Sequence, residues 1–499
     1  MSRTRFHRRF PLFALALASL VACGCDGDQY HATIQRTSFG IPHITAQDWG
    51  SLGFGEGYAA AEDHLCSIVD QVVRVRSERA KYFGAGEDNR HLISDVAMRA
   101  LEVRERAALD METYPGELQS LHEGYVAGFN HYLSETGVEN VRGWCRGQPW
   151  VGPIELLDLA SYSRSLIMGS TQFAGPIVVA EPPGTTGEVA LGPADFQDDL
   201  GASNGWAIGS DRSESGRGML VANPHYPWVG SNRFWEKHLV IPGEFESYGV
   251  GLLGIPGTMI GFNENIAWTH TVSSGPRYTL YRVPLKAGDH TTYLFDGEER
   301  AMSSREISVQ VLQDDGSLEE VTRRVYFTHH GPVLSFSGFE WTGDFAFAIR
   351  DANLDNNEAP VQWLAMQRAQ NMDEFQEAHA RYAGMPWVNT ISTSAEGRAW
   401  YTDVSATPSL SAQAVEAWLE MTRTDRQIGG ALAGGILLLD GGDSRFEWVD
   451  HAAARDPGIL PFSSLPQLER RDYVFNANDS YWLANSDELL EGLDPLLAL

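Results

Sequence analysis

The chain has 499 residues, 43% of them hydrophobic, which is enough to bury a large core and allows roughly two to four domains. Its formal net charge is -29 at pH 7, with a sequence pI near 4.8. A nucleic-acid-binding protein needs clustered lysine and arginine, so this acidity argues against a nucleic-acid partner, although it selects no particular substrate.

The first 22 residues have the pattern of an export signal. Four arginines precede an apolar run at residues 10–21 that is too short to span a membrane. The run ends in Leu-Val-Ala-Cys, which resembles the bacterial lipobox, whose cysteine, here Cys23, is lipidated and becomes the new N-terminus. Ordinary signal cleavage near Ala22 or Cys25 is the alternative. We expect a periplasmic protein or a membrane-anchored lipoprotein of a Gram-negative-type bacterium, touching a membrane only through such an anchor.

Residues 33–45, TIQRTSFGIPHIT, alternate apolar and polar side chains around a bend, which predicts two strands joined by a tight turn. His43 lies at this bend, where a structural hydrogen-bonding role is more common than a catalytic one. Apolar residues at helical spacing predict one or two helices in residues 56–84 and an amphipathic helix in residues 117–133. The part of the chain before residue 169 is therefore expected to be largely helical.

Export permits disulfide bonds. Of the four cysteines, only Cys66 and Cys145 lie in the expected folded region, so they are the one candidate internal pair. We expect a bridge between them. Two buried free thiols are the alternative, because sequence does not show whether the two Cα atoms come within about 7 Å.

Residues 169–202 are rich in Gly, Pro, Thr and acidic side chains without helical periodicity, which predicts a loop. The loop leads into Gly201-Ala202-Ser203-Asn204-Gly205, a match to G-x-S-x-G, the nucleophile elbow of α/β-hydrolases. An elbow needs a buried strand before the serine and a helix after it. Here the preceding segment is acidic, and apolar runs at residues 206–209 and 219–222 bracket a turn-rich segment, which predicts a β-hairpin instead.

A serine at the start of a strand has another use, as an N-terminal nucleophile. If the bond between Ala202 and Ser203 is cut, Ser203 gains an α-amine beside its own hydroxyl. An unperturbed α-amine has a pKa of about 7.7 to 8.0, so a useful fraction is unprotonated at neutral pH. It can take the hydroxyl proton directly or through one water, and this chemistry needs no metal or organic cofactor.

Residues 203–209, SNGWAIG, followed by Asn223-Pro224-His225, resemble the start of the mature β chain of the penicillin acylase family. The continuation His225-Tyr226-Pro227-Trp228 is similar to the branch that contains acyl-homoserine lactone acylases and aculeacin-type lipopeptide acylases. The agreement extends from about residue 30 to the last residues of the chain.

The resemblance implies an α+β protein with the N-terminal nucleophile hydrolase fold, an αββα sandwich of two stacked antiparallel sheets covered by helices. After the signal peptide at residues 1–22, it implies a mostly helical α chain at residues 23–175, an excised linker at residues 176–202 and a β chain at residues 203–499. The two chains of the precursor would stay associated. The sequence does not place the upstream cut.

Several runs in the expected β chain read as strands, at residues 238–241, 248–253, 307–312 and 324–327. Between the last run and Gly331-Pro332 lie the adjacent His329 and His330. Neighbouring side chains on a strand point to opposite faces, and no cysteine or carboxylate ligand pattern accompanies these two histidines. We therefore expect a turn there and no metal site.

The resemblance also assigns roles to four residues. Ser203 is the nucleophile, and His225 organises the α-amine and assists processing. The developing oxyanion would be held by the backbone N–H of Val272 and by the side-chain amide of Asn478, with Asn476 as the nearby competitor for the amide role.

An acyl chain needs apolar walls, because each buried methylene contributes about 0.8 kcal/mol. The resemblance implies that Tyr226, Leu252, Trp387 and Val388 line such a pocket. Without the resemblance they would read as core residues.

The expected function is self-processing followed by removal of an acyl chain from an N-acyl amide, either a long-chain N-acyl-homoserine lactone or an acylated cyclic lipopeptide. A β-lactam acylase is an alternative of the same class. A surface lipoprotein that binds a ligand without catalysis, or a degenerate acylase, is the alternative of another class.

Two features depart from the family pattern. Ala202 precedes the nucleophile where glycine is commoner, although both residues are small enough for a strained cleavage turn. The family also continues well past the Asn478 motif, so we expect the chain ending at Leu499 to be truncated and less active than a complete member.

Overall fold

The computed structural model describes residues 29–185, 201–229 and 232–498. The expected signal peptide and Cys23 lie outside these residues. Of the helices described, none is long and apolar enough to cross a membrane. The α-helices are α1 (Trp49–Val75), α2 (Arg79–Phe83), α3 (Arg90–Ala100), α4 (Val103–Met111), α5 (Gly116–Thr136), α6 (Leu156–Ile167), α7 (Ala174–Val179), α8 (Ala359–Arg368), α9 (Met372–Tyr382), α10 (Ala412–Thr424) and α11 (Arg426–Ala433).

The largest sheet combines strands from both sides of Ser203. Its neighbours are antiparallel except for β2 and β5, which run parallel. Because β1 pairs with β2, and β2 pairs with β5 of the part that follows Ser203, the two parts of the chain share one sheet. In spatial order its strands are β1 (Ala32–Arg36), β2 (Pro42–Ala46), β5 (Phe234–Ile241), β6 (Phe245–Leu252), β7 (Ile260–Phe262), β8 (Ile266–Val272), β16 (Val388–Ser394), β17 (Ala399–Thr402) and β19 (Gln467–Arg470).

A three-stranded sheet stacks on one face of this large sheet. Its order is β20 (Tyr473–Asn476), β3 (Ala202–Ile208) and β4 (Met219–His225), all antiparallel. Alternate residues of β8 face the two neighbouring layers, since Trp268 packs on Phe375 of α9, whereas the Thr269 methyl lies against Gly205 of β3. A Cβ at Gly205 would come within 2.8 Å of that methyl, so only glycine permits this approach. Helix, sheet and sheet are thus stacked as three successive layers of the expected αββα sandwich, although β2 and β5 make the large sheet mixed rather than purely antiparallel.

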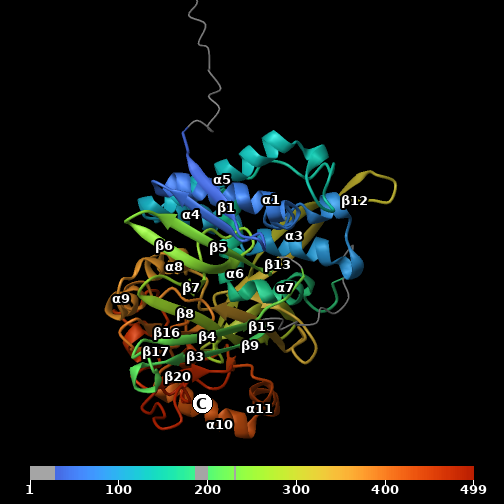
Figure 1. Ribbon diagram of the computed structural model, residues 1–499. Coiled ribbons are helices and arrows are strands. Elements are labelled where there is room, and N and C mark those ends of the chain that lie inside the picture. Colours follow the sequence, from blue (N-terminus) through green and yellow to red (C-terminus); the bar gives the residue numbers. More distant parts are fainter. Residues whose placement is uncertain (1–28, 186–200, 230–231, 499) are drawn as a thin grey trace, which may run out of the picture.

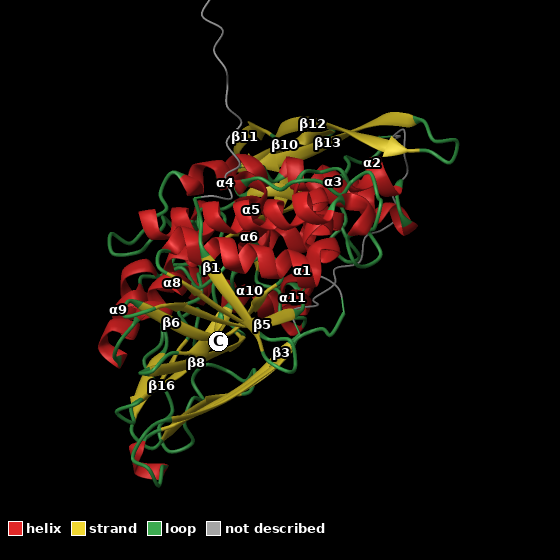
Figure 2. Cartoon of the chain, turned by 45° about the horizontal axis from the view of Figure 1, so that its top comes forward, coloured by secondary structure: helices red, strands yellow, loops and turns green. Residues whose placement is uncertain are grey.

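A second large sheet lies on the far side of the helices of the N-terminal part (Figures 1 and 2). Helix α1 contacts β2 and β5 of the first sheet, whereas α2 and α3 contact β12 of the second. The sequence did not separate this sheet from the first. In order its strands are β11 (Glu298–Ala301), β10 (Asp289–Phe295), β9 (Tyr278–Lys286), β15 (Phe345–Asp351), β14 (Gly331–Leu334), β13 (Leu318–Thr328) and β12 (Ser303–Leu312), with β18 (Leu438–Asp440) parallel to β9.

The predicted elements are present. Residues 33–45 form the hairpin of β1 and β2, and residues 56–84 fall within α1 and α2. Residues 117–133 lie inside α5, and the four predicted strand runs lie in β5, β6, β12 and β13, the second ending one residue after β6. Cys66 and Cys145 form the predicted disulfide, with Cα atoms 5.3 Å apart.

The prediction of an irregular loop from residue 169 to residue 202 is wrong at its start. Residues 169–173 form a 3₁₀ turn and α7 follows, with Ile177 and Val178 fully buried. This short apolar run has little helical signal of its own, but it packs against β13 and β14 of the second sheet. Tertiary packing, rather than periodicity, makes it helical. Residues 186–200 lie outside the described part of the chain.

Close packing of α1 on α5 fixes where α5 lies. A Cβ on Gly53 of α1 would come 2.0 Å from the Leu121 carbonyl oxygen, and one on Gly124 of α5 would come 1.9 Å from that of Gly50. Glycine at both positions lets the two backbones touch, as in other small-residue helix crossings. The crossing positions the side chains of residues 118–122, which form part of the pocket described below.

Candidate active site

Ser203 lies near the start of β3, between β20 and β4, and only 2% of its surface is exposed. In this uncut chain its backbone N–H donates to Asn478 Oδ1 at 2.6 Å, and its Oγ donates to the carbonyl oxygen of Ala202 at 2.6 Å. The serine hydroxyl therefore lies against the peptide bond whose cleavage would free its amine. No helix follows the serine, because β3 continues to Ile208, which confirms that the G-x-S-x-G match is not a nucleophile elbow.

Asn478 reaches Ser203 from the turn after β20. Its backbone is in the left-handed region, with φ at 66°, which asparagine tolerates better than most residues. Its Nδ2 donates to the Val272 carbonyl oxygen at 3.1 Å, and its backbone N–H donates to Asn476 Oδ1 at 2.9 Å. Asn476 Oδ1 also accepts from Thr271 Oγ1 at 2.6 Å. Of the two candidate asparagines, Asn478 contacts the serine and Asn476 holds the turn.

Val272 is the last residue of β8 and lies opposite Val388 of β16. The next residue, Ser273, donates its N–H to the Trp387 carbonyl oxygen at 3.2 Å. In an antiparallel ladder, hydrogen-bonded and non-hydrogen-bonded pairs alternate, so the Val272–Val388 pair is a non-hydrogen-bonded one. The Val272 N–H therefore points away from β16, as an oxyanion donor must.

His225 is not brought to the serine side chain. It lies opposite Ala202 in the ladder, and Ser203 lies opposite Pro224. Directly opposed residues present their side chains on one face, so the His225 ring and the Ser203 hydroxyl are on opposite faces of the ribbon. The ring Nε2 instead contacts the side-chain amides of Asn223 at 3.1 Å and Asn204 at 3.4 Å.

An apolar pocket opens beside Ser203 and encloses about 420 Å³, part of it open to solvent. The four residues expected from the resemblance all line it, together with Ser203 and Val272. Its lining is Ser203, Pro224, Tyr226, Phe234, Leu252, Met259, Ile260, His270, Thr271, Val272, Trp363, Trp387 and Val388.

A family model described as penicillin amidase matches residues 31–493 of the chain. The chain belongs to the penicillin amidase family. It is 40% identical over 487 residues to the acyl-homoserine lactone acylase PvdQ of Pseudomonas fluorescens strain Pf0-1, covering 94% of this chain and 61% of the relative. It is 36% identical over 508 residues to the aculeacin-A acylase of Actinoplanes utahensis, covering 97% of this chain and 64% of the relative.

The chain thus spans about three-fifths of the length of these curated relatives. Among solved structures it is similar to a thermostable penicillin G acylase from Alcaligenes faecalis, with a TM-score of 0.44 and 20% identity, over 58% of this chain and 46% of that chain.

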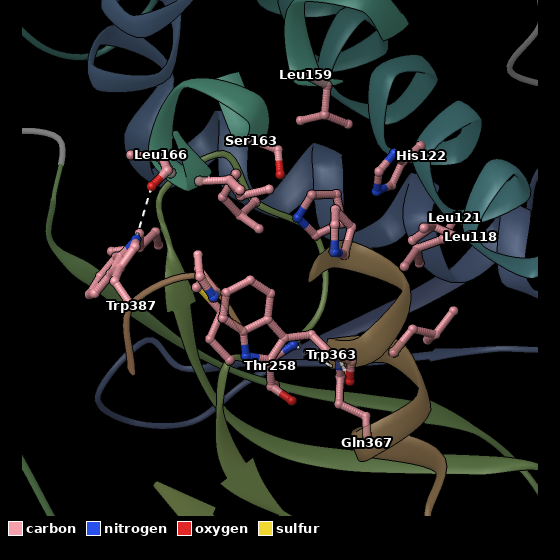
Figure 3. A pocket seen from close by; sticks show the side chains of 18 residues that line it. Leu118, Leu121, His122, Leu159, Ser163, Leu166, Thr258, Trp363, Gln367 and Trp387 are labelled. Carbon is pink, nitrogen blue, oxygen red and sulfur yellow. Dashed lines mark hydrogen bonds between the residues drawn. The ribbon is translucent and has the colours of Figure 1, made fainter. Parts of the chain in front are cut away.

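In this penicillin amidase family member a second apolar pocket of about 710 Å³ adjoins the first (Figure 3). Leu252, Met259, Trp363 and Trp387 line both pockets. The inner pocket reaches helices of the N-terminal part, and its lining is Leu118, Leu121, His122, Leu159, Ser163, Leu166, Ile167, Leu252, Ile255, Pro256, Thr258, Met259, Pro360, Trp363, Leu364, Gln367, Pro386 and Trp387. Two adjoining apolar pockets with shared walls therefore lie beside Ser203.

Burial keeps the titratable groups of the outer pocket uncharged. It lowers the pKa of His270 to about 4 and raises that of Tyr226 above its ordinary value. The His270 ring has partners on both sides, because Trp363 Nε1 donates to its Nε2 at 3.1 Å and the Asn389 carbonyl lies 3.1 Å from its Nδ1. The pocket therefore presents neutral, largely apolar walls at pH 7.

A buried ion pair supports the loop that connects β6 to β7. Lys237 Nζ lies 2.6 Å from Glu56 Oε1, and both side chains are fully buried. The same carboxylate accepts from the Gly257 N–H at 3.0 Å, and Lys237 donates to the Ile255 carbonyl at 3.2 Å. The pair thereby holds the segment that includes the pocket residues Ile255 and Pro256.

His43 and His329–His330 lie outside the pocket lining. His43 Nδ1 contacts His238 Nδ1 at 2.8 Å, the hydrogen-bonding role expected of it. His329 and His330 form the predicted turn after β13. Their possible ligand atoms and those of Glu447 all lie within 4.8 Å of one another. The expectation that the two rings point to opposite faces without a carboxylate nearby is therefore wrong, because a turn does not alternate its side chains as a strand does.

The same Glu447 carboxylate also binds Arg350 at 3.0 Å and His329 Nε2 at 3.1 Å. A guanidinium this close repels a further cation. The cluster therefore reads as an ion-pair network that joins the turn to residue 447.

The sequence reasoning missed the network behind Asn478 and missed Trp363, one of the two tryptophans that line both pockets. Asn389 Nδ2 donates to Thr271 Oγ1 at 2.9 Å and to the Val272 carbonyl at 3.1 Å, and Tyr401 OH donates to Asn389 Oδ1 at 2.9 Å. Polar residues inside strand-like runs, Thr271 in residues 266–272 and Asn389 in residues 388–394, are the signal that could have found them. Trp363 carried no signal beyond its place on an apolar helix face.

Proposed function

We propose that the protein is an amide hydrolase whose nucleophile is Ser203 and whose acyl pocket is the pair of adjoining cavities. The observation that carries the proposal is the position of the Ser203 side chain at the outer end of a neutral, apolar double pocket. The family match and the acylase relatives support the reaction class.

The first step would be self-processing. Ser203 Oγ attacks the Ala202 carbonyl carbon, the C–N bond breaks, and the hydroxyl proton passes to the departing nitrogen, leaving an ester and a free α-amine. Water then hydrolyses the ester, which restores the hydroxyl and frees the Ala202 carboxylate. The contact of Oγ with the Ala202 carbonyl oxygen at 2.6 Å supports this step.

In the second reaction the α-amine takes the Ser203 proton while Oγ attacks the substrate amide carbonyl. The developing oxyanion would be held by the Val272 N–H and by Asn478 Nδ2. The proton then passes to the leaving amine, and water releases the acid from the acyl-enzyme. The ring of His225 lies on the other face of the β3–β4 hairpin. His225 would therefore affect Ser203 only indirectly, by holding β4 against β3.

The substrate would be an amide of a long, apolar acyl chain. The printed names of the relatives point to an N-acyl-homoserine lactone or an acylated lipopeptide such as aculeacin A, and the family name supports a β-lactam substrate only at the level of the family. The double cavity favours the long-chain substrates.

We also propose that the retained α chain extends past residue 175, to about Pro183. Glu181 pairs with Arg323 of β13 at 3.0 Å, and the Pro183 carbonyl contacts His290 Nδ1 at 3.2 Å. Excision from residue 176 would remove the buried Ile177 and Val178 from the core. Export by residues 1–22 and a lipid on Cys23 remain part of the proposal, and the intact mass of the mature N-terminal fragment tests both.

The function is tested by following release of the amine from homoserine lactone amides of short and long chains, an acylated cyclic peptide and a penicillin. Long-chain amides should be hydrolysed fastest, and Ser203→Ala should release no amine. Ser304→Ala, the same change at an exposed serine of β12 outside both pockets, is the matched control and should stay active. A processed wild type that hydrolyses none of these amides would refute the proposal in favour of a ligand-binding protein.

A further inference from the structure

Two polar side chains of the inner pocket have no partner. His122 projects from α5 and is 7% exposed, and Ser163 projects from α6. Figure 3 shows the His122 ring and the Ser163 hydroxyl directed into the same cavity. Within the described part of the chain neither side chain has a hydrogen bond, and the His122 ring packs edge-on against Tyr114, with 5.6 Å between the ring centroids.

Other polar groups of that wall are satisfied inside the protein. The Thr258 hydroxyl bonds Ser247 at 2.6 Å, and Gln367 donates to the Trp363 carbonyl at 3.1 Å. The indole of Trp387 donates to the Leu166 carbonyl at 3.0 Å. The unused hydrogen-bonding groups of this wall are therefore those of His122 and Ser163. An unsubstituted hydrocarbon chain in the pocket would bury them without a partner, which costs binding free energy.

Burial lowers the pKa of His122 to about 4, so at pH 7 its ring is neutral and offers one N–H donor and one nitrogen acceptor. A serine hydroxyl also both donates and accepts. A carboxylate would need a cation to offset its desolvation, and neither side chain provides one. The matching ligand group is thus a neutral one that donates and accepts, which describes an alcohol.

We propose that His122 and Ser163 form a subsite for a hydroxyl group on the part of the acyl chain remote from the amide. The subsite makes the inner pocket selective for hydroxylated long acyl chains over plain ones of the same length. This inference rests on the proposed function, because the acyl chain must lie in the double pocket with its carbonyl at Ser203.

The test compares a plain dodecanoyl amide with isomers hydroxylated at each carbon near the chain end. Two quantities are measured for each amide. The first is turnover by the wild type, and the second is binding to Ser203→Ala, detected by the quenching of tryptophan fluorescence. The hydroxylated-to-plain ratio is taken within each variant, so a general loss of activity cancels. For at least one isomer we expect a wild-type preference of about three- to tenfold, the value of one net hydrogen bond.

His122→Phe keeps the ring contact with Tyr114 but removes both polar nitrogens, and it should abolish the preference in turnover and in binding. His122→Gln retains a donor and an acceptor and should keep part of it, whereas Leu121→Met, a neighbouring wall change, should leave the ratio unaltered. A wild type with no preference for any hydroxylated isomer, or a His122→Phe variant that keeps it, overturns the subsite. Selective binding to Ser203→Ala with no turnover by the wild type would instead overturn the proposed function alone.

Discussion

The backbone N–H of Ser203 donates to the side-chain oxygen of Asn478, 275 residues further along the chain, at 2.6 Å. The amide nitrogen of the same side chain donates to the carbonyl of Val272. One residue thus contacts both the nitrogen that would become the catalytic base and the strand end that would bind the oxyanion. Asn476 holds the turn that places Asn478, because it accepts from the Asn478 N–H and donates to the Asp479 carbonyl.

Replacing Asn478 by aspartate separates these two contacts. The Asn478→Asp side chain still accepts from the Ser203 nitrogen but has no N–H for the oxyanion. Loss of one such donor costs about 10²- to 10³-fold in kcat, and we expect a fall of that size for a long-chain amide. Thermal unfolding serves as the control for folding, and a folded, processed variant with near-wild-type kcat would contradict the role of the amide.

Leu252 lies where the two pockets meet, so its size should set the usable chain length. In Leu252→Trp the larger ring blocks the passage, and long chains lose the burial of their distal methylenes. Each methylene is worth about 0.8 kcal/mol, so excluding two of them costs roughly tenfold in kcat/KM. Short-chain amides, which do not reach the inner pocket, should lose much less. An equal loss for short and long chains would show that the inner pocket does not receive the chain.

Asp95 gives the protein a pH-dependent stability that is separate from catalysis. Its fully buried carboxyl group accepts from the N–H groups of Arg79 and Ala80 at the start of α2, and burial raises its pKa from 3.8 to about 7. Because the native state holds this proton more tightly than the unfolded state, the stabilisation is complete below about pH 3.8 and is lost as the pH rises through about 7.

Asp95→Asn removes the titration, since an amide is neutral at every pH. Between pH 4 and pH 7, within the window set by that shift, the stability of the wild type should fall relative to that of the variant. Urea unfolding midpoints at several pH values measure the difference. Parallel profiles for the two proteins would mean that Asp95 does not titrate in this range.

Local patterns were sufficient to predict much of this molecule, but not how distant segments meet. The β3–β4 hairpin, helix α5 and the disulfide between Cys66 and Cys145 followed from alternation, periodicity and compartment. The face on which His225 projects depends on its register against Ala202, and a shift of one residue would reverse it. A motif that places His225 in the chain therefore could not show that its ring points away from Ser203.

The inner pocket shows the same limit. Its walls come from α5 and α6 before Ser203 and from α8 after it, brought together by packing such as the glycine crossing of α1 and α5. In the sequence, His122 is one more residue of an amphipathic helix. Helix α7 was missed for a related reason, because its four-residue apolar run becomes helical only against the second sheet.

The central claim is that Ser203 becomes an N-terminal nucleophile through cleavage of its own preceding bond. Intact mass and N-terminal sequencing of the purified wild type and of Ser203→Ala test it most directly. The account predicts a wild-type fragment beginning Ser203-Asn204-Gly205 and a single uncut chain for Ser203→Ala. Cleavage of Ser203→Ala at the same bond would contradict self-processing, and full activity of a wild type that stays uncut would contradict the claim itself.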